Sequence, residues 1–137
     1  MKLLDTSVVA DIDRGGVDRR VAKLDEQGHH AISMVTVTEL RLGVEIQYED
    51  DTERYRDALD ALDRLLARFE TQPIARPVAT TAADIIATLR RRGQPLDDLH
   101  DVYIAATART RQLPVLTANT ADFERIDDIR VLDWAAF

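Results

Sequence analysis

Four carboxylates of this chain fall where predicted strands end or predicted helices begin: Asp5, Glu39, Asp101 and Asp122. Asp5 ends a short apolar strand, and Asp122 follows the strand that we expect to end at Thr117. Glu39 and Asp101 lie in the first turns of two predicted helices. Oxygen ligands of this kind suit Mg²⁺ or Mn²⁺ better than Zn²⁺. A cation held there could activate a water, so the residue types suggest hydrolysis of a phosphodiester bond.

Each of these acids also has an ordinary structural explanation, as a helix cap or as a complement to a helix dipole. Thr36-x-x-Glu39 matches a capping box, and Asp98 stands before Asp101 as a potential cap. Asp5 could in the same way cap the helix that follows it. A single acid of this kind therefore does not indicate a functional site, whereas the four acids together do.

Helical spacing distinguishes two of the four acids. Glu39 shares a predicted helix face with Leu42, Gly43 and Ile46, and Asp101 shares one with Ile104, Ala105 and Ala108. We therefore expect both carboxylates to point toward the protein, where an unpaired charge is costly. No Lys or Arg stands in an obvious pairing position, so a cation is the expected partner. Further groups that could hydrogen-bond these carboxylates or a phosphate are Thr6, Ser7, Thr117 and Asn119.

Strands and helices alternate along the chain, which predicts an α/β fold with a parallel sheet covered on both faces. We predict strands at 2–4, 30–35, 72–76, 114–117 and 130–132. Helices are expected before Gly15, before Gly28, and at 36–47, 53–69, 78–89 and 99–111, with a turn or short helix at 122–126. The whole chain, 1–137, then forms one domain with a sheet of four to five strands. Ligands of such folds bind at the carboxyl edge of the sheet, where all four acids fall.

Composition narrows the remaining possibilities. The net charge of −7 argues against loose binding of nucleic acid by a basic surface, although acids that hold a metal contribute to it. Cysteine is absent, which excludes disulfides, thiolate zinc sites and Cys nucleophiles. No apolar run is long enough to span a membrane, and we expect a cytoplasmic protein. The excess of Asp and the scarcity of Lys indicate adaptation to high salt.

At these residues the chain resembles the PIN-domain family, most closely its VapC-type toxin ribonucleases. The matching segments are Leu3–Ser7, Ser33–Leu40 with Gly43, and Asp101–Ala108 followed by Thr117-x-Asn119-x-x-Asp122-Phe123. The resemblance implies a three-layer α/β/α fold with strand order 3-2-1-4-5 and four metal-binding acids at Asp5, Glu39, Asp101 and Asp122. It also implies Mg²⁺-dependent cleavage of RNA, a homodimer, and inhibition by a cognate antitoxin in a type II VapBC-like pair. One position departs from the pattern, because Ala118 replaces a residue that is often basic.

Other functions fit the sequence less well. A receiver-like signalling domain needs paired acids after the first strand and a Lys after a late one, whereas Asp5 stands alone. A phosphatase of the haloacid dehalogenase type needs a second Asp where this chain has Ser7. A non-catalytic PIN-like module that binds RNA or protein remains an alternative. The run Arg90-Arg91-Arg92 is interpreted as a solvated helix end, and His100 as a surface residue that could assist Asp101.

Overall fold

Five parallel strands form the centre of the fold, in the order β3-β2-β1-β4-β5, as the resemblance implied. The structure is a computed structural model that describes all 137 residues. Its strands are β1 (Leu3–Leu4), β2 (Ala31–Ser33), β3 (Glu70–Gln72), β4 (Val115–Thr117) and β5 (Val131–Asp133). Its helices are α1 (Thr6–Arg14), α2 (Asp18–Glu26), α3 (Met34–Gln47), α4 (Glu53–Leu66), α5 (Arg76–Arg91), α6 (Leu99–Arg111) and α7 (Ala121–Glu124).

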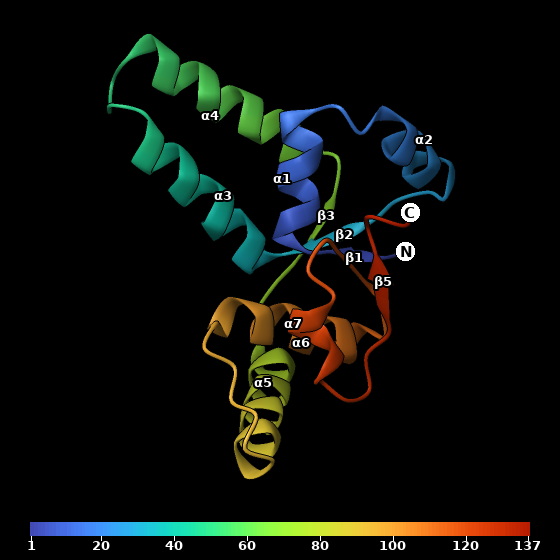
Figure 1. Cartoon of the computed structure of the whole chain (residues 1–137). Coiled ribbons are helices and arrows are strands. Elements are labelled where there is room, and N and C mark those ends of the chain that lie inside the picture. Colours follow the sequence, from blue (N-terminus) through green and yellow to red (C-terminus); the bar gives the residue numbers. More distant parts are fainter.

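The helices lie in two layers, one on each face of the sheet (Figure 1). Helices α1, α2 and α4 lie above the sheet in this view, and α5, α6 and α7 lie below it. Helices α3 and α4 extend together beyond the side of the sheet (Figure 1). The expected three-layer α/β/α architecture is therefore confirmed.

Alternating side chains of the strands supply the two cores. Within β1, Leu3 packs with buried residues of α5 and α6, and Leu4 packs with those of α1 and α2. The neighbouring strands keep this alternation because their registers match, with Leu4 opposite Ile32 on one side and Leu116 on the other. The short central strands are thus buried on both faces, as parallel strands usually are.

The second strand is shorter than predicted, and the helix after it begins earlier. Ser33 caps α3, since its Oγ accepts a hydrogen bond of 3.1 Å from the backbone N–H of Val35. The capping box predicted at Thr36-x-x-Glu39 is therefore wrong, and Glu39 lies in the second turn of α3 rather than the first.

The third strand also ends earlier than predicted. Its residues Glu70–Gln72 pair in register with β2, and Pro73 then stops the ladder because it lacks an N–H. Arg76 begins helix α5, with Pro77 in its first turn, where the missing N–H costs nothing. No helix of the chain has the length and apolar character needed to span a bilayer.

Candidate active site

Asp5 lies at the carboxyl end of the central strand, at the point where the strand order reverses, and its side chain is 4% exposed. It occupies the N-cap position of α1, yet its carboxylate makes no capping hydrogen bond. Its Oδ2 instead accepts from the hydroxyls of Ser7, at 2.7 Å, and Thr117, at 2.8 Å. Capping therefore does not explain Asp5, and its Oδ1 receives no hydrogen bond from the protein.

Backbone amides fix the direction of both hydroxyls. The N–H of Ala118 donates to Ser7 Oγ at 3.1 Å, and the N–H of Asn119 donates to Thr117 Oγ1 at 2.9 Å. Each hydroxyl therefore accepts from the backbone and directs its own proton at Asp5. Asn119 takes part through its backbone, and its side chain is exposed.

Glu39 is held by a chain of two threonines. Its Oε1 accepts a hydrogen bond of 2.8 Å from Thr6 Oγ1, which lies 3.0 Å from Thr36 Oγ1. Since the only hydroxyl proton of Thr6 points at Glu39, Thr36 must donate to Thr6. Thr36 is fully buried, and the sequence analysis did not assign it to the site.

The two predicted helix faces differ in the structure. Asp101 does share a face with buried Ile104 and Ala105, as expected. The core face predicted around Glu39 is wrong, because Leu42 is 51% exposed and Ile46 is 77% exposed, although Glu39 itself does point toward the protein and contacts Thr6. The far half of α3 extends beyond the sheet together with α4, so only part of its circumference is covered (Figure 1).

The pKa of Asp101 indicates that the four acids lie close to one another. Asp101 lies in the first turn of α6, three residues after Asp98. Asp98 caps the helix, since its carboxylate accepts a hydrogen bond of 2.8 Å from the backbone N–H of His100. Burial, and after it the negative charges of neighbouring carboxylates, raise the pKa of Asp101 from 3.8 to about 7. Those carboxylates are Asp98, Asp5, Asp122 and Glu39. All three of the other predicted acids therefore act on Asp101.

Asp122 lies within α7, whose N-cap is Thr120, and so it is not the cap that one interpretation suggested. Neither Lys nor Arg forms an ion pair with any of the four acids. The nitrogen-bearing side chain that is paired with one of them is that of His100, whose Nδ1 lies 3.3 Å from Glu39 Oε2. The interpretation of His100 as a surface residue is therefore incomplete. Its side chain is 46% exposed, but it also contacts one of the four acids.

The donor atoms of this set fit a hard divalent cation. All four side chains offer oxygen, one oxygen of Asp5 is free, and no base neutralises the group. The side chains as they stand do not place three such groups around one point. Mutual repulsion keeps such carboxylates apart.

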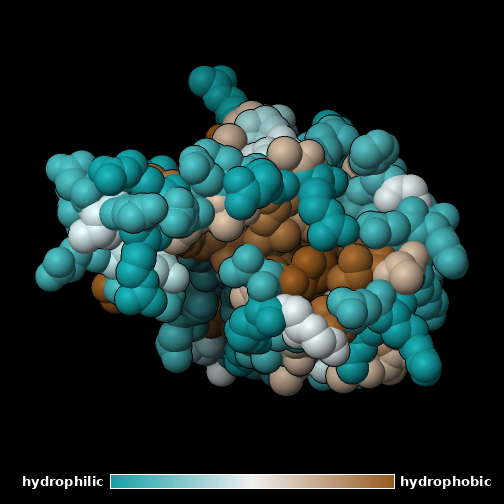
Figure 2. Space-filling model, turned by 90° about the horizontal axis from the view of Figure 1, so that it is seen from above, coloured by the Kyte–Doolittle hydropathy of each residue, from teal (hydrophilic) through white to brown (hydrophobic).

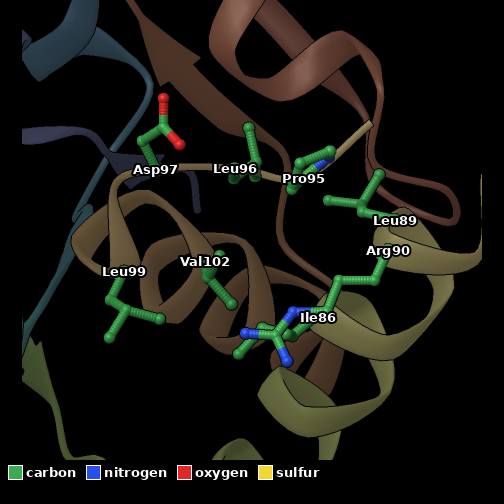
Figure 3. A pocket seen from close by; sticks show the side chains of 8 residues that line it. All are labelled: Ile86, Leu89, Arg90, Pro95, Leu96, Asp97, Leu99 and Val102. Carbon is green, nitrogen blue, oxygen red and sulfur yellow. The ribbon is translucent and has the colours of Figure 1, made fainter. Parts of the chain in front are cut away.

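The three arginines at the end of α5, Arg90, Arg91 and Arg92, contact other parts of the molecule than the four acids. Arg90 lines a cleft of about 360 Å³ between the end of α5 and the start of α6 (Figure 3). Most of the other lining residues are apolar, and the carboxylate of Asp97 points away from them (Figure 3). Arg91 contacts Thr88, and Arg92 forms an ion pair with Asp127. The run is thus divided among separate contacts and does not face the acids as a unit.

Comparison with known proteins identifies the family of this chain. Residues 2–129 match the family model of the PIN domain. The chain belongs to the PIN-domain family. This PIN domain is 31% identical to Ribonuclease VapC of Rickettsia bellii, over 95% of this chain and 93% of the relative. It is 33% identical to the tRNA(fMet)-specific endonuclease VapC of Shigella flexneri, over 80% of this chain and 78% of that protein. These matches place the chain among the VapC-type ribonucleases.

Solved structures of PIN proteins show the same fold. A DNA-bound VapBC complex from Salmonella typhimurium contains a chain that matches with a TM-score of 0.84 and 28% identity, over 98% of this chain and 99% of that one. The FitAcB structure from Neisseria gonorrhoeae matches with a TM-score of 0.78 and 32% identity, over the full length of both chains. The PIN fold and the VapC type were thus both predictable from the sequence.

Proposed function

We propose that Asp5, Glu39, Asp101 and Asp122 hold Mg²⁺, or Mn²⁺ in its place, and that the chain uses this site to hydrolyse phosphodiester bonds of RNA. One observation carries the proposal. Four acids predicted from separate segments lie near one another at the carboxyl edge of the sheet, and burial together with the charges of its neighbours raises the pKa of Asp101. Ordinary caps would each serve their own helix and would not need to converge.

The residues have distinct tasks in this proposal. Ser7 and Thr117 direct their protons at Asp5 Oδ2, which leaves Oδ1 to face the cation. Thr6 holds Glu39 in the same way. A divalent cation in this place supplies positive charge that lowers the pKa of the attacking water and offsets charge on the phosphate. The buried side of Asp101 keeps bulk water from screening that interaction.

The direct test is RNA cleavage by the purified chain in Mg²⁺ and in EDTA. We expect fragments with Mg²⁺ or Mn²⁺ and none with EDTA, because the acids alone cannot approach an anionic phosphate. Restoring Mg²⁺ to the EDTA-treated sample should restore cleavage, which controls for denaturation. Binding of RNA without cleavage in any divalent metal would instead favour the non-catalytic PIN-like module.

We further propose that the chain is the toxin of a VapBC-like pair, acting on RNA in the cytoplasm and inhibited by a small antitoxin. The Salmonella typhimurium and Neisseria gonorrhoeae structures are those of VapBC and FitAcB assemblies, which supports a protein partner. An arginine from that partner would suit the acidic site, since a guanidinium can engage carboxylates with paired hydrogen bonds. The apolar side chains that α3 exposes, Leu42 and Ile46, suit the homodimer that the resemblance implies.

A cleft between α3, α4 and α1 offers a place for the antitoxin. It measures about 270 Å³ and is lined mainly by apolar residues, among them Leu40, Val44, Ala61 and Leu65. Seen from above the sheet, hydrophobic side chains gather in a hollow with a hydrophilic rim (Figure 2). An amphipathic helix could lay its apolar face into such a groove.

Ala61→Asp should weaken antitoxin binding by at least about tenfold, because the new carboxylate would lose its water in an apolar contact. Ala61 is exposed in the isolated chain, so the fold should tolerate the change. Ala79→Asp is the matched control, since Ala79 is an exposed alanine of α5 outside the cleft. The measurement is copurification of an antitoxin expressed from the same operon. Equal capture by both variants would place the antitoxin elsewhere.

A further inference from the structure

His100 joins two of the proposed metal-binding residues. It directly precedes Asp101 in α6, and its Nδ1 lies 3.3 Å from Oε2 of Glu39 on α3. The two helices belong to segments that are far apart in the chain. The imidazole is the one nitrogen-bearing side chain that reaches this otherwise acidic group, and the proposed mechanism does not yet use it.

Glu39 needs more than one anchor. Its side chain is 27% exposed and arises from a helix whose far half extends away from the sheet. Thr6 holds only Oε1, so rotation about that hydrogen bond would carry Oε2 toward water. His100 lies on the other side, with its Nδ1 3.3 Å from Oε2, close enough for electrostatic attraction to that oxygen. The hydrogen bond from Thr6 to Oε1 and the contact of His100 with Oε2 together restrict both oxygens of the carboxylate.

The first turn of α6 fixes where the imidazole can lie. The carboxylate of Asp98 caps the helix by accepting from the backbone N–H of His100 at 2.8 Å, so the backbone that carries the ring is held. Nδ1 faces two carboxylates, Glu39 Oε2 at 3.3 Å and Asp98 Oδ1 at 3.8 Å, so a proton on this nitrogen would be favoured by both. A neutral imidazole that carries this proton attracts the carboxylates without bringing a full positive charge. Lys or Arg in its place would compete directly with a divalent cation.

We propose that His100 is a positioning residue, which holds Glu39 Oε2 in the direction needed for the divalent cation. This inference rests on the proposed function. Because His100 acts through Glu39, its loss should weaken metal binding and leave the affinity for RNA nearly unchanged. Residues that orient metal ligands typically account for about ten- to a hundredfold in metal affinity.

The test compares three substitutions of His100 by the Mg²⁺ concentration that gives half of the maximal rise in melting temperature. His100→Ala removes the imidazole, and we expect it to raise that concentration by about tenfold. His100→Asn places an amide N–H where Nδ1 stood and should restore wild-type Mg²⁺ affinity. His100→Gln places its amide near the position of Nε2 and should resemble the alanine variant. Cleavage by His100→Ala should recover when Mg²⁺ is raised tenfold, with an unchanged KM for RNA.

The outcomes separate this inference from the proposed function. A wild-type chain that shows neither a Mg²⁺-dependent shift nor Mg²⁺-dependent cleavage would overturn both. A normal wild-type response with the same Mg²⁺ midpoint in His100→Ala would overturn the role of His100 alone. A weakened response in all three variants would also contradict it, because the asparagine should then have restored the contact. Circular dichroism of each variant shows whether the fold is retained.

Discussion

Asp5→Asn should lower the rate of RNA cleavage by at least about a hundredfold while the chain stays folded. Asparagine has the shape of aspartate, and its amide oxygen can still accept from Ser7 and Thr117. Its amide NH₂ then replaces Oδ1, so a donor rather than an acceptor faces the proposed cation. The charge that would attract the cation is lost as well. The two effects act on the metal site and leave the packing of the strand unchanged.

The measurement is the initial rate of cleavage of one RNA substrate at saturating Mg²⁺, with the far-ultraviolet circular dichroism of the same samples. Asp60→Asn is the matched control, because Asp60 is exposed on α4 and the charge change is the same. Its rate should equal that of the wild type. Undiminished cleavage by Asp5→Asn would remove Asp5 from the site and would contradict the proposed mechanism.

The order of elements and the edge of the sheet at which the four acids lie were predictable because both follow from simple rules. Alternating strand and helix patterns imply a parallel sheet, and the carboxyl ends of its strands share one edge. Asp5 and Asp101 could thus be assigned to one site although much of the chain separates them. The boundary of α3 was not predictable, since Ser33 and Thr36 are both good caps and the tertiary structure decides between them.

The particular contacts between helices could not be predicted from the sequence. Thr36 reaches the site only because α3 lies beside α1, where its hydroxyl meets that of Thr6. His100 meets Glu39 only because α6 lies beside α3. Leu42 and Ile46 have apolar side chains at helical spacing, which indicates a core, yet the end of α3 extends past the sheet. Helical periodicity identifies a face, and only the packing shows what covers that face.

Asp101→Asn should stabilise the chain in EDTA above about pH 7 and should abolish most of its stabilisation by Mg²⁺. In the folded chain, burial and neighbouring carboxylates raise the pKa of Asp101 from 3.8 to about 7. Between these values the folded state binds more protons than the unfolded state, so the free energy of unfolding falls as pH rises. Above about pH 7 the folded chain carries the full cost of the ionised carboxylate, which asparagine removes.

The gain in stability from Asp101→Asn should therefore be greatest above pH 7 and should shrink as the pH falls toward 4. Urea unfolding in EDTA at pH 5 and pH 8 measures both values, at one fixed salt concentration because salt screens the exposed charges. A carboxylate that only complemented the helix dipole predicts the opposite sign, since its loss from the first turn costs about 0.3–1 kcal/mol. Asp98→Ala is the comparison, because Asp98 is the observed cap of the same helix and alanine, unlike asparagine, cannot accept the capping hydrogen bond.

Magnesium should reverse the order of stability. At a hundredfold excess over its dissociation constant, a ligand adds about 2.7 kcal/mol to the free energy of unfolding. For a chain of this size that gain corresponds to a rise in melting temperature on the order of 5–10 °C. Wild type should show this rise at pH 8, where Asp101 is ionised, and less of it at pH 6, where protons compete with the cation. Asp101→Asn should show little rise at either pH. Equal Mg²⁺-induced shifts in the two proteins would mean that the cation binds elsewhere, and that the raised pKa of Asp101 serves another purpose.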